Sequence, residues 1–133
     1  MQYPGHESMM RAASLAGLAH EDWIQDWPIE VATGDRLVDF IGLLEGHRND
    51  WELTFWFQDL VLESARDRTD LAAFKTVLIE TVFKAVAATY APALINRLKY
   101  WACPDSPLDD TFEVSPIVRE VLRKLADFKN VQE

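Results

Sequence analysis

Apolar residues recur every three or four positions along most of this chain, and this period limits its fold more than any other feature. Such spacing places apolar side chains on one face of an α-helix. No stretch alternates strictly enough between apolar and polar residues to predict a strand, and no internal repeat is present. The sequence therefore predicts an all-α protein.

Residues that start and stop helices divide this pattern into segments. We expect a single helical turn within residues 20–29, a linker at 104–114, and helices over residues 8–19, 35–46, 50–66, 70–88, 90–102 and 115–130. Asn49 or Asp50 is a candidate N-cap, Pro92 suits a first helical turn, and Ser115 before Pro116 is a typical helix start. Burying one apolar stripe from each helix would give a bundle of about five or six amphipathic helices, a single domain over residues 1–133.

Two of these segments show which side chains should face the core. In residues 35–46 one helical face would hold Leu37, Val38, Phe40, Ile41 and Leu44. In residues 50–66 one face would hold Leu53, Trp56, Phe57, Leu60, Val61 and Ser64, leaving outside Glu52, Asp59, Glu63 and Arg66. A charged outer face is typical of helices in a bundle, so Asp59 and Glu63 are expected to be exposed.

Length and composition indicate the class of protein. A chain of 133 residues with 49% hydrophobic and 26% charged residues is typical of one folded domain. The single cysteine, Cys103, cannot form an internal disulfide, as expected in a reducing compartment. Residues 1–17 lack the basic start and apolar run of a signal peptide, and residues 71–93 are too interrupted by charges to span a membrane. We therefore expect a cytoplasmic protein.

No familiar pattern for catalysis, cofactor binding or metal binding is present. No histidine lies four residues from another or in a Glu-x-x-His pair; the three are His6, His20 and His47. The five glycines form no nucleotide-binding loop. Cys103 has no basic residue within three positions and is expected to be a partly buried cysteine at a helix end. We therefore expect no catalytic residue, no cofactor and no metal.

The net charge of −9, from 22 acidic and 13 basic residues, excludes some partners and favours others. It would repel nucleic acid and anionic membranes at long range. Two segments combine acids with aromatic residues and contain no Lys or Arg. Residues 20–35 hold Glu21, Asp22, Trp23, Asp26, Trp27, Glu30 and Asp35, and residues 104–114 hold Asp105, Asp109, Asp110, Phe112 and Glu113.

Acidic surface beside an aromatic anchor suits a basic protein partner, because charge steers the encounter while a buried ring supplies affinity. We therefore expect these residues, together with the acids Asp59 and Glu63, to bind a basic protein. The alternative is that the tryptophans pack into the core and that the loop carboxylates are merely solvated.

The middle of the chain resembles a known family. Residues 51–64, WELTFWFQDLVLES, are followed by an amphipathic helix and by residues 98–103, LKYWAC. This arrangement, over roughly residues 51–103, resembles small helical immunity proteins of bacterial polymorphic toxin systems, whose toxins are delivered by contact-dependent or type VI machinery.

The resemblance implies a non-catalytic cytoplasmic protein that binds a cognate toxin domain and blocks its active site. Such toxins are often nucleases with basic surfaces, which an acidic inhibitor would engage by mimicking phosphate. Two alternatives remain open. One is a phage-encoded inhibitor or small regulatory adaptor that acts by the same mimicry. The other is a small-molecule or metal-dependent enzyme in which inward carboxylates, from among Asp59, Glu63 and Glu80, do the chemistry.

Overall fold

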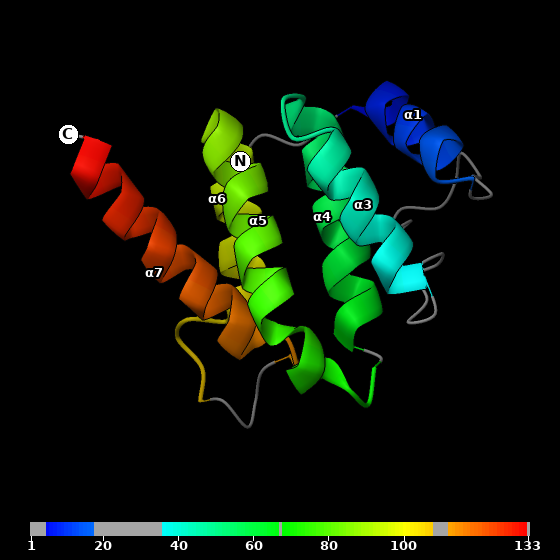
Figure 1. The fold of residues 1–133 in the computed structure, drawn as a ribbon. Helices are drawn as coiled ribbons and strands as arrows, with labels where there is room; N and C mark the ends of the chain where they lie inside the picture. Colours follow the sequence, from blue (N-terminus) through cyan, green and yellow to red (C-terminus); the bar gives the residue numbers. More distant parts are fainter. Residues whose placement is uncertain (1–4, 18–35, 67, 108–111, 133) are drawn as a thin grey trace.

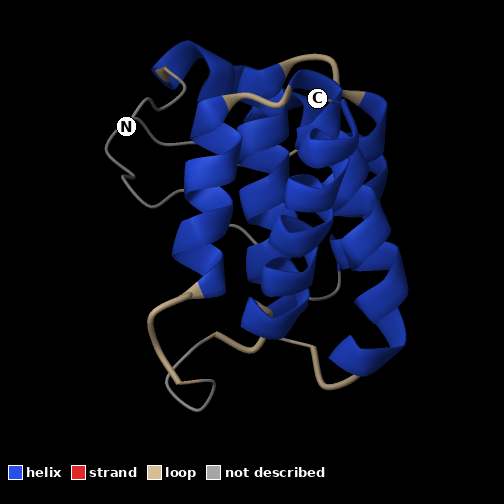
Figure 2. Ribbon diagram, turned by 90° about the vertical axis from the view of Figure 1, so that its left-hand side faces the viewer, coloured by secondary structure: helices blue, strands red, loops and turns tan. Residues whose placement is uncertain are grey.

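The computed structural model describes residues 5–17, 36–66, 68–107 and 112–132. In these ranges every regular element is helical, which confirms the predicted all-α class (Figure 2). The elements are α1 (His6–Ala16), α3 (Leu37–Gly46), α4 (Trp51–Arg66), the 3₁₀ helix η2 (Leu71–Phe74), α5 (Lys75–Thr89), α6 (Pro92–Ala102) and α7 (Ser115–Gln132) (Figure 1).

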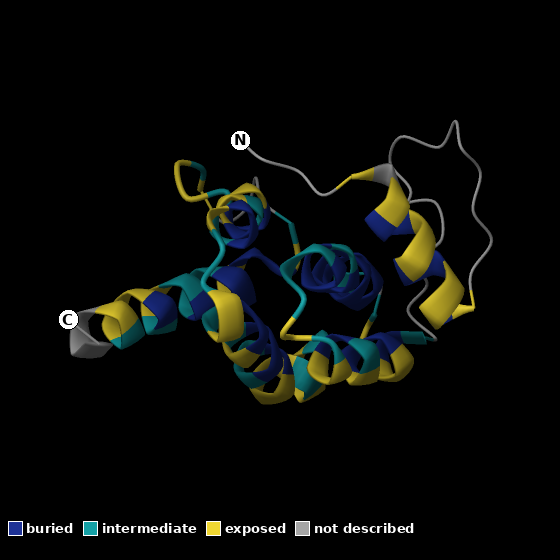
Figure 3. Cartoon of the chain, turned by 90° about the horizontal axis from the view of Figure 1, so that it is seen from above, coloured by how far each residue is buried: buried dark blue, intermediate teal, exposed yellow. Residues whose placement is uncertain are grey.

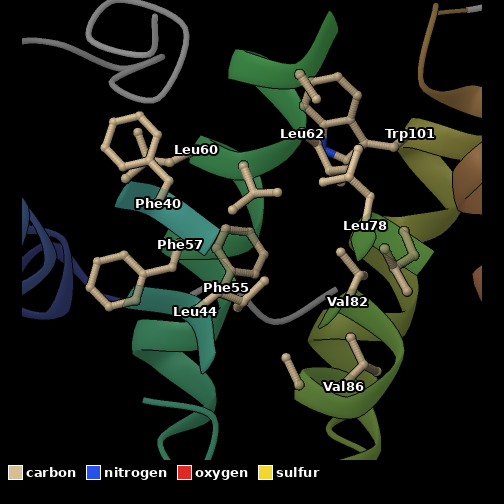
Figure 4. Packing of buried hydrophobic residues seen from close by; sticks show 14 of the residues in the cluster. Phe40, Leu44, Phe55, Phe57, Leu60, Leu62, Leu78, Val82, Val86 and Trp101 are labelled. Carbon is tan, nitrogen blue, oxygen red and sulfur yellow. The ribbon is translucent and has the colours of Figure 1, made fainter. Parts of the chain in front are cut away.

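Helix α4 lies at the centre of the bundle. It contacts α1, α3, α5 and α6, while α7 packs against α5 and α6. Seen from above, the outer helices turn their exposed sides away from it (Figure 3). Side chains from α3, α4, α5 and α6 meet in one core (Figure 4), which a single helical stripe from α4 could not fill.

The central position of α4 overturns the one-sided pattern predicted for it. Its buried residues are Leu53, Thr54, Phe55, Phe57, Gln58, Asp59, Leu60, Val61, Leu62, Glu63, Ser64 and Ala65. A helix with neighbours on several sides buries most of its circumference, and here that includes polar residues. The predicted exposure of Asp59 and Glu63 is therefore wrong: these residues are 1% and 6% exposed.

Helix ends follow local sequence at several points. Asp50 Oδ1 accepts hydrogen bonds from the backbone N–H groups of Glu52 and Leu53, at 3.1 and 3.2 Å, which confirms its predicted role as an N-cap. Pro92 occupies the first turn of α6, also as predicted. Asp35, where the helix over residues 35–46 was expected to start, lies outside the described residues.

Two predicted helices are corrected. The helix expected over residues 8–19 ends at Ala16, because Gly17 adopts the left-handed conformation, φ 66°, that stops a helix. The helix expected from residue 70 begins as the 3₁₀ helix η2, and regular α-helix starts only at Lys75. In α3, Val38 is 65% exposed and does not share the buried stripe.

Glycines 17 and 42 provide opposite tests of this helix geometry. Gly42 lies inside α3, and a Cβ there would meet nothing within 4 Å, so Gly42→Ala should stabilise the protein by about 0.5–1 kcal/mol. Gly17→Ala should destabilise it by about 1 kcal/mol, because φ is 66° there. Urea unfolding measures both values. Equal effects of the two substitutions would contradict the assigned backbone.

Gln58 is a second stability test. It is fully buried, and neither amide atom has a hydrogen-bond partner among the described residues. An unpaired buried polar group costs about 1–3 kcal/mol, so Gln58→Met, which nearly conserves volume, should stabilise the fold by about 1 kcal/mol or more. Asn96→Met, at an exposed amide on α6, is the control and should change stability by less than about 0.5 kcal/mol. Destabilisation by Gln58→Met in urea unfolding would contradict this placement.

Candidate functional site

The charge of the chain is unevenly divided. The described residues contain all 13 lysines and arginines and an equal number of acids, so their formal charges balance. The remaining nine acids account for the whole net charge of −9. Five of them fall in residues 18–35, two in 108–111, and one each at positions 67 and 133.

Eight of these nine acids lie in stretches of sequence that adjoin described helix ends at one end of the bundle. At this end α3 and α7 begin and α4 and α6 end (Figure 1), and we call it the acidic end. Residues 18–35 lead into α3, position 67 follows α4, and residues 108–111 lie between α6 and α7.

Contacts at the acidic end tie the flanking residues together. Arg36 Nη2 donates to the carbonyl oxygen of Ala16 at 2.9 Å, which brings the start of α3 close to the end of α1. Arg66 Nε lies 3.8 Å from Glu113 Oε2, and its guanidinium lies 5.3 Å from the centre of the Phe112 ring. These contacts place the start of α3 beside the end of α1, and the end of α4 beside the residues that precede α7.

Beneath the acidic end, a buried ion pair joins α4 to α6. Asp59 Oδ2 lies 2.7 Å from Arg97 Nη2, and Arg97 Nε donates to both carboxylate oxygens at 2.9 and 3.0 Å. Trp101 Nε1 donates to Asp59 Oδ1 at 3.0 Å. The Arg97 guanidinium also lies 4.4 Å from the centre of the Tyr100 ring. A carboxylate is tolerated inside the bundle because each of its oxygens is paired.

The same network holds both ends of the connection between α6 and α7. The Ser115 hydroxyl donates to the carbonyl oxygen of Trp101 at 2.7 Å and accepts from the N–H of Phe112 at 3.1 Å. Arg119 donates to the carbonyl oxygens of Ala102, Cys103 and Ser106, at 2.8, 2.5 and 2.9 Å. Residues beside Asp105 and Glu113 are therefore held to α6 and α7 by hydrogen bonds.

The predicted partner-binding residues other than Asp59 and Glu63 fall into three groups. Asp105 and Glu113 are exposed, and Glu113 faces Arg66. Phe112 is half-buried, with ring centres 5.5 Å from Tyr100 and 4.9 Å from Trp101, so the expected aromatic anchor packs against the chain itself. The residues outside the described ranges are Glu21, Asp22, Trp23, Asp26, Trp27, Glu30, Asp109 and Asp110.

Asp59 and Glu63 cannot meet a partner directly because they are buried. Asp59 is enclosed with Arg97 and Trp101, and Glu63 lies 3.2 Å from Arg66. The sequence pattern did not identify Arg97 as a partner for Asp59. The missed signal is spacing, since Arg97 lies four residues before Trp101 and shares a helical face with it.

The described residues contain no group of three or more His, Cys, Asp or Glu side chains arranged to hold a metal ion. Cys103 is a half-buried cysteine at the end of α6, as predicted, with its Sγ 3.6 Å from the carbonyl oxygen of Tyr100. Among these residues, no helix combines the length and apolar character that crossing a membrane requires.

Comparisons with protein-family models, with curated proteins and with solved structures found no match to this chain. Its function is therefore inferred from its own charge and geometry.

The Asp59 ion pair predicts a large difference between two aspartates. Asp59→Ala should destabilise the protein by about 3–5 kcal/mol, because it leaves Arg97 and the Trp101 N–H without their partner. Asp39→Ala removes an exposed carboxylate 3.5 Å from Arg36 and should cost less than about 1 kcal/mol. Urea unfolding measures both. Similar small costs for the two substitutions would contradict the buried network.

Proposed function

We propose that this chain is a non-catalytic inhibitor that binds a basic protein through its acidic end, as an immunity protein binds and neutralises a cognate toxin in the cytoplasm. One observation carries the proposal: residues 20–35 and 104–114 together hold nine acids and no Lys or Arg, and the start of α3 and the start of α7, which follow them in the chain, lie at the same end of the bundle. Charge concentrated in this way creates a directional field that a uniformly acidic surface lacks.

The physical consequence of this arrangement is steering. Like-signed charge gathered on one side of a protein raises the rate at which an oppositely charged partner meets that side, and salt weakens the effect. A nuclease toxin has a basic surface for its phosphate backbone substrate, so carboxylates at the acidic end would compete for the same cations. The anchoring of the α6–α7 connection by Ser115 and Arg119 reduces the ordering that binding would require.

The test requires the partner, which affinity capture from the source cell at low salt and co-expression with a neighbouring toxin gene would identify. Replacing Asp105, Asp109 and Asp110 with lysine should lower the association rate constant about tenfold or more, with a smaller change in the dissociation rate. Stopped-flow or surface plasmon resonance measurements at several salt concentrations separate the two rates.

A matched reversal controls for net charge. Glu7, Glu52 and Asp127 lie on α1, on the first turn of α4 and late in α7, away from the acidic end. Their replacement by lysine makes the same change in net charge and should alter the association rate constant by less than about threefold. If both triple variants associate equally fast, the acidic end is not the docking surface.

A further inference from the structure

A groove runs along the outer face of the bundle between α3 and α5, which pack side by side (Figure 1). Its volume is about 660 Å³, within the range of about 300–1,000 Å³ that ligand sites occupy. On α5 it extends from Thr76 to Lys84, about 12 Å at the rise of an α-helix. This length matches about two turns of a helix laid along it.

The groove carries an ordered set of side chains. Both helices run away from the acidic end, and Thr81 Oγ1 donates to Glu45 Oε1 at 3.4 Å, which fixes their register. Val77, 48% exposed, lies one turn before Thr81, and Arg48 and Lys84 each lie three residues beyond this pair. From the acidic end, the groove therefore presents the apolar Val77 first, then the acidic Glu45, and then the basic Arg48 and Lys84.

Two cations that line the groove have no ion-pair partner among the described residues. Arg48 and Lys84 form no ion pair with any described residue, although Glu45 and Glu80 lie one helical turn before them. Glu80 instead pairs with Lys124 of α7; the Lys124 ammonium and, more weakly, the charge of Lys84 lower the pKa of Glu80 and so keep it ionised. Glu45 makes its contact with the neutral Thr81 hydroxyl. Two cations and one carboxylate are thus available to an occupant.

Two glycines line the same groove. Gly42 and Gly46 lie one turn apart on α3, and a Cβ at either position would meet nothing within 4 Å. Packing inside the protein therefore does not require glycine at these positions, although glycine weakens a helix. Without side chains there, the backbone of another chain can approach α3 closely.

We propose that this groove binds a helical segment of a protein partner, in addition to and independently of the contact at the acidic end. The segment presents a carboxylate to Arg48 and Lys84 and, one turn away on the same face, a cation to Glu45. An apolar side chain covers Val77.

The proposal can be tested with a synthetic alanine-based helix of about 16 residues that carries Lys and Glu four positions apart, and Leu on the same face. In a titration of ¹⁵N-labelled protein, the amide resonances of Gly42, Gly46 and Thr81 should shift saturably. A control peptide of the same composition, with Lys and Glu on opposite faces, should bind at least about tenfold more weakly. Absence of shifts in the groove, or equal shifts with both peptides, would overturn the proposal.

Variants of the chain test the same contacts. Arg48→Glu combined with Lys84→Glu should weaken peptide binding at least about tenfold, as should Gly42→Leu, which adds a bulky side chain to the wall of the groove at a position where a Cβ meets nothing within 4 Å. Lys99→Glu combined with Lys129→Glu, at exposed sites on α6 and α7, makes the same charge change and should leave binding unchanged. Circular dichroism confirms that each variant is folded. Undiminished binding to the groove variants would overturn the proposed site.

Discussion

The ion pair between Asp59 and Arg97 sets the geometry on which the acidic end depends. A carboxylate enclosed by helices requires partners for both oxygens, and the registration of α6 against α4 brings Arg97 and Trp101 to it together. A buried pair adds little net stability over an apolar pair of similar shape, so its effect here is mainly on arrangement. Through Ser115, which bonds the Trp101 carbonyl, that arrangement reaches the start of α7.

The uneven spread of charge along the chain reconciles two demands. Helices that balance acids with bases avoid self-repulsion, while a partner of opposite charge requires an excess of one sign. The described residues, with 13 acids and 13 bases, satisfy the first demand, and the acids of residues 20–35 and 104–114 supply the excess that the second requires. The groove between α3 and α5 adds mixed charges on a different face, where shape and charge order would select a partner helix.

Local signals in the sequence predicted the helices but not the position of α4. Caps such as Asp50 and a first-turn proline at Pro92 act within a few residues, so their effects could be predicted from spacing alone. Burial of Asp59 could not, because it depends on α6 supplying Arg97 from 38 residues away. An amphipathic pattern assigns polar residues to the outside, and it fails for a helix that other helices surround.

Dependence of association on salt tests the central electrostatic claim most directly. We would measure the association and dissociation rate constants of the unmodified chain and its captured partner from about 50 to 500 mM salt, over which the Debye length shortens from about 14 to about 4 Å. The charge division predicts that association slows about tenfold or more while dissociation changes much less. An association rate that does not vary with salt would contradict recognition by the acidic end.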